Sequence, residues 1–427
     1  MAESFKITDY DCIGFDLDNT ICEYRIAPMI QMIYQVITEY LINNFNYSSD
    51  HLRKPVDYDF LQKGLILDIE RGNILKLNSN GQIVKASHGT RFMHDHEIIS
   101  TYGPQRKWSV TDSFVENFMN TWNGPLSKKI RPLLDYFDMP ISLVFARCID
   151  SVDDQGPPNT YDVWPHVFNG LHNMYSRENF ATNVGDYFYK LKNSPSLYYN
   201  KCPDYVFDWL KELKKRKKVF LISGSHVDYA TFSASHSLGP NWRDLFDISV
   251  FFAKKPGFFS DQRQFYNTEA LAETNVTNEI SFGNVYSQGN WNQLHNLLKK
   301  ETGKSNPKCL YVGDNILQDV IAPQRFSGLD TIAVVEEMKM DCKDKKYCPD
   351  TNMLKPNKWS SYFIDADNSE TSIWSSFIIN HGKLCVPSIK DLASKSIDYE
   401  YQTFSKLKKY GGFFPYIPHS LHKFLKL

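Results

Sequence analysis

Between residues 203 and 335, short apolar runs alternate with stretches of helical periodicity, and this alternation constrains the fold more than any other feature of the chain. The run at 219–222 is continuously apolar, as in a strand that is buried on both faces. Strands are predicted at 219–222, 248–252, 309–312 and 331–335, and helices at 203–216, 226–236, 291–301 and 316–326. Strands that alternate with helices in this way form a parallel sheet with helices on both faces. The sequence therefore predicts an α/β fold with a doubly wound parallel sheet.

A further predicted strand, near the N-terminus, ends in two carboxylates within the stretch Ile13-Gly14-Phe15-Asp16-Leu17-Asp18-Asn19-Thr20. Because side chains alternate along a strand, Asp16 and Asp18 should point the same way while Leu17 turns into the core. Two carboxylates held close together repel each other unless a cation or a substrate uses them. The functional interpretation is a nucleophile, a proton-transfer group and a bound divalent metal. The alternative is an ordinary strand end followed by a turn that Asp and Asn favour.

The segment after this strand does not return to the sheet for about 170 residues, which is too long for a simple crossover. It contains a predicted amphipathic helix at 28–44, a β-hairpin whose turn is 78–82, and mainly helical residues at 108–195. We expect an inserted α+β domain. The predicted organisation is a discontinuous core at 1–25 and 196–340, an inserted cap domain at 26–195, and a C-terminal extension at 341–427 packed on the core. A charged loop is predicted at 336–358.

Charge and cysteine usage narrow the class of protein. The formal net charge is -1, which argues against a general nucleic-acid or membrane surface. No run approaches the roughly 18 apolar residues of a spanning helix, and no secretory signal pattern opens the chain. The 8 cysteines are scattered without a CxxC pair, which fits a reducing compartment. We expect a cytoplasmic protein whose partner is a small molecule.

Polar residues that could take part in catalysis or binding follow four of the predicted strands, in order along the chain. They are Asp16, Asp18 and Thr20 after the first strand, Ser223 with Gly224 and Ser225 after the second, Lys255 after the third, and Asp314 with Asp319 after the fourth. In a doubly wound sheet, ligands bind at the C-terminal ends of the strands. Each piece alone has an ordinary explanation, such as a helix N-cap or a surface lysine. Together they indicate one site.

Phosphoryl transfer to a carboxylate gives each of these residues a role. Asp16 is the predicted nucleophile, and Asp18 the group that protonates the leaving oxygen and later activates water. Mg²⁺ is the predicted cofactor, held by Asp16, Asp314 and the backbone carbonyl of Asp18, with Asp319 binding the metal or orienting Lys255. The predicted phosphate-binding groups are Thr20, Ser223, Gly224, Ser225 and Lys255, since hydroxyls, helix N-terminal N–H groups and an ammonium all bind phosphate oxygens.

The ordered set resembles the haloacid dehalogenase superfamily of phosphohydrolases with an aspartate nucleophile. More narrowly, it is similar to the cytosolic purine 5′-nucleotidase family. The residues that carry this resemblance are Phe15-Asp16-Leu17-Asp18-Asn19-Thr20, Lys255-Pro256-Gly257-Phe258-Phe259, Tyr286-Ser287-Gln288-Gly289-Asn290 and Tyr311-Val312-Gly313-Asp314, with Asn73-Ile74-Leu75-Lys76-Leu77 and Ala86-Ser87-His88-Gly89-Thr90 in the inserted domain. The resemblance extends over nearly the whole chain.

The resemblance implies a Rossmann-like, Mg²⁺-dependent core with a large cap inserted after the first strand, and a nucleoside monophosphate as substrate. Two positions differ from the purine-specific enzymes, which have Thr-Asn-Ser where this chain has Ser223-Gly224-Ser225, and Phe-Asn where it has Thr90-Arg91. An aromatic ring that could stack on a base is thereby replaced by a cation. His88 and Arg91 are the candidate substrate residues of the cap.

Two other functions stay open at the level of sequence. The first is a phosphatase that acts on a phosphorylated metabolite other than a nucleotide, with the altered cap setting the choice. The second is a catalytically weak protein that keeps the fold as a binding or scaffold module. The altered second motif and the C-terminal extension support this alternative. The sequence is compatible with a homo-oligomer and does not decide the oligomeric state.

Overall fold

The computed structural model describes residues 4–342, 358–365 and 370–425. The chain divides into two compact units, each discontinuous in sequence. The first unit comprises Met1–Arg25, Ser194–Met338 and Phe377–Ile417, and the second comprises Ile26–Asn193, Lys339–Ser376 and Pro418–Leu427. Most of the loop predicted at 336–358 lies outside the described residues. The domain boundaries drawn from the sequence stay a prediction.

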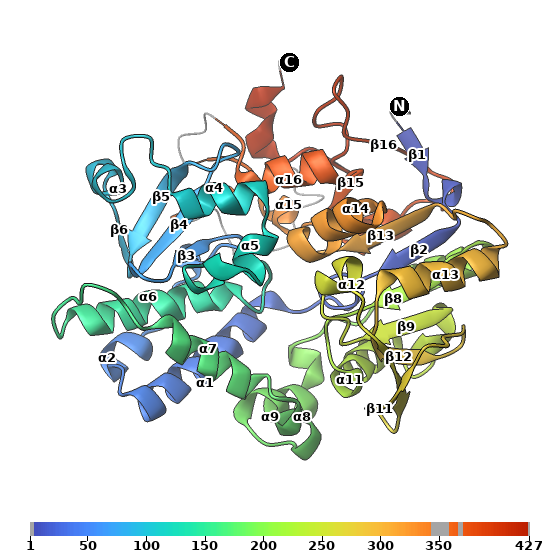
Figure 1. The fold of residues 1–427 in the computed structure, drawn as a ribbon, viewed down its shortest axis with the longest axis horizontal. Helices are drawn as coiled ribbons and strands as arrows, with labels where there is room; N and C mark the ends of the chain where they lie inside the picture. The colour runs from blue at the N-terminus through green and yellow to red at the C-terminus, as the bar shows by residue number, and fades with distance from the viewer. Residues whose placement is uncertain (1–3, 343–357, 366–369, 426–427) are drawn as a thin grey trace. The chain divides into compact units, whose positions relative to one another are not determined.

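The first unit is built on a nine-stranded sheet (Figure 1). Its order is β11 (Ala272–Thr277), β10 (Phe265–Glu269), β12 (Val285–Gln288), β9 (Ile248–Phe251), β8 (Lys218–Ile222), β2 (Cys12–Phe15), β13 (Cys309–Gly313), β14 (Asp330–Val334) and β15 (Leu384–Val386). All neighbours from β12 to β15 pair in parallel, while β10 pairs antiparallel with both β11 and β12. The doubly wound parallel sheet is confirmed, and the five predicted strands are its consecutive centre. Strands β12 and β15 were not predicted.

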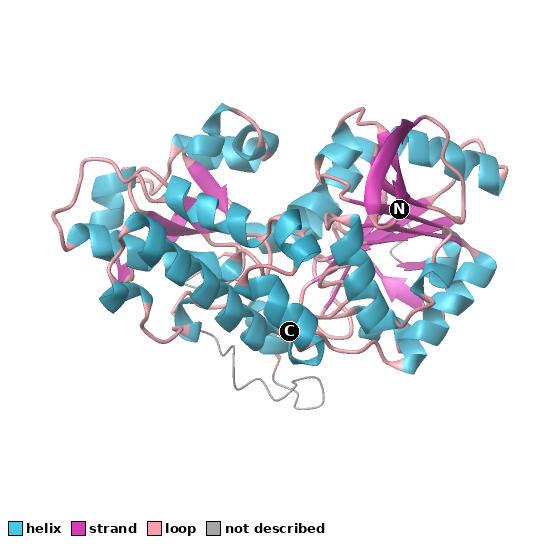
Figure 2. Cartoon of the chain, turned by 90° about the horizontal axis from the view of Figure 1, so that it is seen from below, coloured by secondary structure: helices cyan, strands magenta, loops and turns pink. Residues whose placement is uncertain are grey.

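Helices cover both faces of this sheet (Figures 1 and 2). They are α10 (Asp204–Arg216), α11 (Val227–Leu238), α12 (Gly257–Ser260), α13 (Trp291–Thr302), α14 (Ala322–Ser327) and α17 (Ile389–Ala393). The helix predicted at 316–326 begins as a π-helix, Ile316–Ile321, before α14 follows with a proline in its first turn. A separate two-stranded sheet pairs β1 (Ser4–Lys6) with β16 (Glu400–Gln402). Among the described residues, none of the helices combines the length and the hydropathy of a membrane-spanning segment.

Alternation along β2 explains why the first unit packs closely around its central strand. Ile13 and Phe15 lie in the hydrophobic cluster that α10 and α11 share with the sheet. Gly14 faces the other way, and a Cβ there would lie 2.1 Å from a ring carbon of Phe220 and 2.7 Å from Tyr311. Glycine is therefore required at this position, because two aromatic rings occupy the space that a side chain would need.

The second unit contains a five-stranded antiparallel sheet surrounded by helices (Figure 1). Its order is β6 (Arg91–Phe92), β5 (Ile83–His88), β4 (Asn73–Leu77), β3 (Ile66–Asp68) and β7 (Ile130–Pro132). The helices are α1 (Ile26–Phe45), α2 (Ser49–Leu52), α3 (Asp95–Tyr102), α4 (Ser109–Glu116), α5 (Met119–Trp122), α6 (Met139–Asp153), α7 (Trp164–Met174), α8 (Arg177–Thr182), α9 (Asp186–Asn193) and α15 (Glu337–Met340), the last spanning the boundary, as does α16 (Ile373–His381). The predicted helix at 28–44 and the hairpin β4–β5 are confirmed.

Two buried cations hold backbone segments of the second unit together. Lys76 on β4 donates to the carbonyl oxygens of Trp359 and Ser361, each at 2.6 Å. Burial lowers the pKa of Lys76 to about 7. Arg147 on α6 donates to the carbonyl oxygens of Lys54 at 2.6 Å and Pro55 at 2.7 Å. A buried carbonyl without a donor is costly, so each cation secures a loop that has no other regular pairing.

Candidate active site

The first carboxylate, Asp16, follows β2 directly. Its backbone N–H donates to the carbonyl of Val312 on β13 at 2.8 Å, so the parallel ladder continues as far as this residue. Leu17 is fully buried in the core, as alternation predicts. The chain then turns sharply, with the N–H groups of Ile21 and Cys22 both bonding to the carbonyl of Leu17. Asp16 is thus held by the hydrogen bonding of the sheet, whereas Asp18 lies in the turn.

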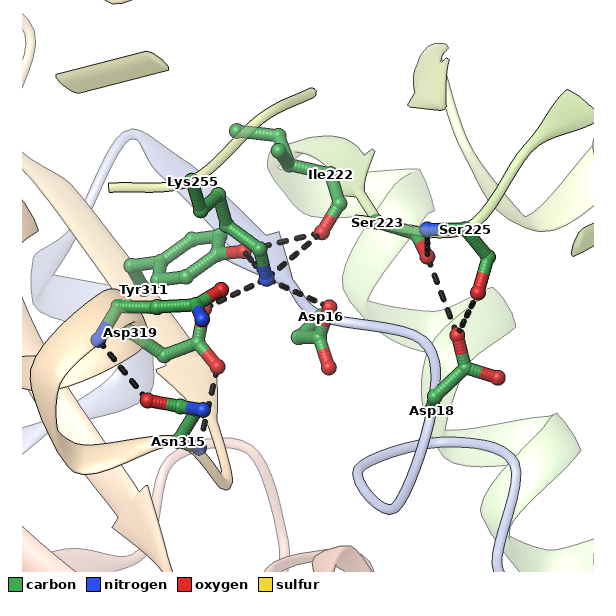
Figure 3. A network of polar contacts seen from close by, with 10 residues as sticks. Asp16, Asp18, Ile222, Ser223, Ser225, Lys255, Tyr311, Asn315 and Asp319 are labelled. Atoms are coloured by element: carbon green, nitrogen blue, oxygen red, sulfur yellow. Dashed lines mark hydrogen bonds and ion pairs between the residues drawn. The ribbon is translucent and has the colours of Figure 1, made fainter. Parts of the chain in front are cut away.

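Lys255 joins Asp16 to a carboxylate from another strand end (Figure 3). Its Nζ lies 2.7 Å from Oδ1 of Asp16 and 2.6 Å from Oδ1 of Asp319. Two further oxygens, the carbonyl of Ile222 and the hydroxyl of Tyr311, lie 3.4 Å from the same nitrogen. Although burial lowers the pKa of Lys255, the charges of Asp16 and Asp319 raise it well above its ordinary value. The lysine is therefore a fixed cation between two anions.

The segment after β13 supplies two further carboxylates, Asp314 just after the strand and Asp319 in the π-helix Ile316–Ile321. Asp314 and Asp319 are both buried. Asp319 also accepts the backbone N–H of Asn315 at 3.1 Å, which fixes its second oxygen. Gly313 allows this close approach, since a Cβ at that position would lie 2.4 Å from the Cβ of Asp319. One oxygen each of Asp16, Asp314 and Asp319 lies within 4.8 Å of the others.

The chemistry of this donor set fits a divalent cation. Three buried carboxylates face a single ammonium, so the site carries more negative than positive charge. Burial and the charges of Asp319 and Asp18 raise the pKa of Asp16, and Lys255 opposes the shift. Carboxylate oxygens are the ligands that hard divalent cations prefer. Asp16, Asp314 and Asp319 could thus hold a metal ion. Asp16 and Asp314 belong to the predicted ligand set, for which Asp18 was expected to contribute only its backbone carbonyl.

The carboxylate of Asp18 contacts the predicted phosphate loop (Figure 3). Ser225 Oγ donates to its Oδ2 at 2.6 Å, and Ser223 Oγ lies 3.2 Å from the same oxygen. The N–H of Ser225 bonds in turn to Ser223 Oγ at 3.1 Å, and α11 begins two residues later. Gly224 is exposed between them. Thr20 Oγ1 is buried and has no hydrogen-bond partner among the described residues.

Two tyrosines of the site were not predicted. Tyr311 lies on β13, and its hydroxyl donates to the carbonyl of Ile222 at 3.1 Å beside Lys255. Tyr24 lies in the turn after β2, and its hydroxyl donates to Oδ1 of Asp18 at 2.7 Å. Tyr311 belongs to a motif that carries the family resemblance but was given no role there, since a tyrosine in an apolar strand is usually a packing residue. Tyr24, between a glutamate and an arginine, belongs to no such motif.

The two candidate residues of the cap are engaged within the second unit. His88 is half-buried, with Nδ1 lying 2.8 Å from Asn73 and Nε2 3.1 Å from Asp153. Arg91 makes two parallel hydrogen bonds of 3.0 Å to Glu97. Both side chains thus have protein partners in the structure. Their contact with substrate stays a prediction.

Comparison with known proteins connects this geometry to a family. The sequence profile of the 5′ nucleotidase family matches residues 1–380, which include every residue of the site. The chain belongs to the 5′ nucleotidase family. This confirms the resemblance drawn from the motifs. The family match also spans both units, so the second unit belongs to the same family architecture as the site.

Two named relatives of this 5′ nucleotidase family member match it over nearly their whole length. It is 34% identical over 451 residues to 5′-nucleotidase domain-containing protein 1 of Homo sapiens, covering 98% of this chain and 97% of the human protein. It is also 34% identical over 448 residues to the protein of the same name from Bos taurus. 5′-nucleotidase domain-containing protein 2 of Rattus norvegicus is 24% identical over 345 residues, which cover 79% of this chain and 59% of the rat protein. The motifs of the chain resemble those of 5′-nucleotidase domain-containing protein 1, and the alignments bear this out.

Proposed function

We propose that this chain is a Mg²⁺-dependent phosphohydrolase that releases phosphate from 5′-nucleotides through an aspartyl-phosphate intermediate. The observation that carries the proposal is Lys255, joined to Asp16 and Asp319 at a buried strand end that also holds Asp314. Buried ion pairs are a poor source of stability, so an excess of buried carboxylates supports a role in binding and chemistry. Membership of the 5′ nucleotidase family supports the same class of reaction.

The first half-reaction transfers the phosphoryl group to the protein. Lys255 holds Oδ1 of Asp16, so Oδ2 is the oxygen that attacks phosphorus. As that bond forms, the bond between phosphorus and the ester oxygen breaks, and Asp18 gives its proton to the leaving oxygen. In the second half-reaction, Asp18 takes a proton from water, the water oxygen attacks phosphorus, and the acyl phosphate bond breaks to restore Asp16.

The remaining residues bind charge. Ser223, Ser225, Thr20 and the N–H groups at the start of α11 bind phosphate oxygens, while Lys255 offsets charge on the transferring group. Asp16, Asp314 and the backbone carbonyl of Asp18 would hold Mg²⁺, with Asp319 in support. When bound, the ion would reduce the repulsion between the anionic phosphate and the attacking carboxylate.

A panel of phosphate monoesters tests the proposal. Purified protein is assayed for phosphate release from purine and pyrimidine nucleoside 5′-monophosphates and from sugar phosphates, with Mg²⁺ or with a chelator. We expect Mg²⁺-dependent turnover that is greatest for a nucleotide. Asp16→Asn should abolish turnover, while Asp244→Asn, at an exposed position of the same unit, should not change it.

The outcomes separate the alternatives. Turnover of sugar phosphates alone would replace the nucleotide by another metabolite. A wild-type rate in Asp16→Asn would refute the role of the nucleophile. No turnover of any ester by folded protein would favour a scaffold.

A further inference from the structure

The carboxylate of Asp18 accepts hydrogen bonds from three hydroxyl groups, and they reach its two oxygens from different sides. Ser225 and Ser223 reach Oδ2, at 2.6 Å and 3.2 Å. Tyr24 reaches Oδ1, at 2.7 Å. Hydrogen bonds to a charged group are about twice as strong as neutral ones, so these contacts decide where the carboxylate points.

The serines cannot hold Asp18 throughout the proposed reaction. Each hydroxyl has one proton to donate. A serine that donates to a phosphate oxygen must therefore release Oδ2 of Asp18. Tyr24 lies outside the phosphate loop, in the turn after Asp18, and is not one of the groups proposed to bind phosphate. Its bond to Oδ1 is the contact that can persist when phosphate is bound.

Tyr24 is itself held by a chain of hydroxyls. Its hydroxyl lies 3.0 Å from that of Tyr229, and the hydroxyl of Tyr199 donates to that of Tyr229 at 3.0 Å. Since Tyr24 donates its only hydroxyl proton to Asp18, Tyr229 must donate to Tyr24. The proton of every link thus points toward the carboxylate, in the order Tyr199, Tyr229, Tyr24. Donors aligned in series polarise and strengthen one another.

Packing also restricts the tyrosines. Tyr24 and Tyr199 are both buried. Their backbones form an antiparallel bridge, and their ring centroids lie 4.6 Å apart. The hydroxyl of Tyr199 lies 3.1 Å from Ser233 Oγ on α11. A side chain fixed by its ring and by its hydroxyl can hold a neighbouring carboxylate with little freedom.

We propose that Tyr24, supported by Tyr229 and Tyr199, is the positioning residue that holds Asp18 for proton transfer, and that bound phosphate draws the serine hydroxyls away from Oδ2. This inference rests on the proposed function. The freed Oδ2 carries the proton that passes to the ester oxygen as the bond from phosphorus to that oxygen breaks. In the hydrolysis step, the same oxygen receives the proton of the attacking water. Oδ1 stays bonded to Tyr24 in both steps.

The test compares substrates that differ in their need for an acid. p-Nitrophenyl phosphate releases a stable anion, whereas a nucleoside 5′-monophosphate releases an alkoxide that must be protonated. The quantity measured is kcat/KM, because it reports the steps up to phosphoryl transfer and not the later hydrolysis. In Tyr24→Phe we expect kcat/KM for the nucleotide to fall about ten- to a hundredfold, the range for one hydrogen bond to a charged group. For p-nitrophenyl phosphate it should fall less than about threefold.

Tyr10→Phe is the matched control. Tyr10 is also a buried tyrosine of the first unit, and its hydroxyl donates to Asp330 at 2.8 Å, before β2 and away from its C-terminal end. Tyr10→Phe should change kcat/KM for neither substrate by more than about twofold, within ordinary mutational scatter. An equal loss for both substrates in Tyr24→Phe, or a loss no larger than in Tyr10→Phe, would overturn the positioning role.

Crystal structures of full-length wild type and Tyr24→Phe, both with inorganic phosphate bound so that the serine hydroxyls are drawn from Oδ2, give a readout that needs no turnover. We expect the Asp18 side chain to leave the orientation that it has in the wild type. An unchanged orientation overturns the inference even if activity falls. A displaced Asp18 in a protein whose wild type hydrolyses no ester supports the positioning role and overturns the proposed function instead.

Discussion

Replacing Lys255 with methionine would leave two buried carboxylates without the ammonium that joins them. The lysine bonds to Asp16 at 2.7 Å and to Asp319 at 2.6 Å. Removing one partner of a buried ion pair costs about 3–5 kcal/mol, because the remaining charge is uncompensated. Lys255 also offsets the repulsion among the carboxylates of Asp16, Asp314 and Asp319, one oxygen of each lying within 4.8 Å of the others, and its removal leaves that repulsion uncompensated.

The assay is thermal unfolding of the full chain without divalent metal. For a unit of about 200 residues, a loss of about 3–5 kcal/mol lowers Tm by roughly 6–20 °C. Lys254→Met is the control, since this neighbouring lysine is exposed and its Nζ lies 4.0 Å from the ring centre of Phe252. An exposed cation–π contact contributes about 0.5–1 kcal/mol, so the control should lose less than roughly 4 °C.

Magnesium gives a second arm to the same experiment. A cation that binds only the folded state raises Tm by mass action, and it should recover part of the loss in Lys255→Met by supplying positive charge to the carboxylates. A Tm for Lys255→Met equal to that of Lys254→Met, without metal, would refute the reasoning. It would mean that Asp16 and Asp319 do not both carry charge beside the lysine.

Three further changes test the rest of the molecule. The pKa of Lys76 is lowered to about 7 in the folded protein, so the unfolded chain binds this proton more tightly. From pH 7 to 9 the unfolding free energy of the wild type should therefore rise, relative to that of Lys76→Met, by about 1.4 kcal/mol per pH unit. Urea unfolding at both pH values measures this difference. Gly14→Ala forces a Cβ to within 2.1 Å of the Phe220 ring and should cost at least about 1–3 kcal/mol in thermal unfolding, whereas Gly224→Ala, with no heavy atom within 4 Å, should leave Tm unchanged. Arg147→Met removes the donor from two backbone carbonyls and should lower the unfolding free energy of the second unit by about 1–3 kcal/mol per carbonyl left unpaired, measured as faster limited proteolysis.

The centre of the sheet could be predicted from the sequence because burial on both faces demands continuous apolar residues. Strands β2, β8 and β13 meet that demand. The predicted bounds of β8 and β13 lie within one residue of those in the structure, and β2 was predicted without bounds, as the strand before Asp16. Strand β12 was not predicted, since Val285–Gln288 contains a serine and a glutamine. Strand β15 has only three residues, Leu384–Val386. Both take their conformation from neighbouring strands that already exist, so their own composition carries little signal.

The candidate site divides along a similar line. Asp16, Lys255 and Asp314 could be brought together from their places in the sequence, because topology puts the C-terminal ends of parallel strands at one edge. Tyr24 could not be assigned to Asp18 in this way. Its support from Tyr229 joins positions 205 residues apart, through the orientation of two side chains and not through the order of strands. Periodicity and spacing predict the course of the backbone, and they do not predict which hydroxyl forms a hydrogen bond with which oxygen.

The two carboxylates that are two residues apart illustrate what the structure adds to the motif. Asp16 contacts an ammonium, which favours its ionised form and opposes the burial that raises its pKa. Asp18 contacts hydroxyls, which can donate to a carboxylate and can also accept from a carboxylic acid. A nucleophile must be ionised, whereas a group that first gives and then takes a proton must be tolerated in both forms. The division of roles between two identical side chains therefore follows from their partners: a lysine that stabilises one charge state, and hydroxyls that accommodate either.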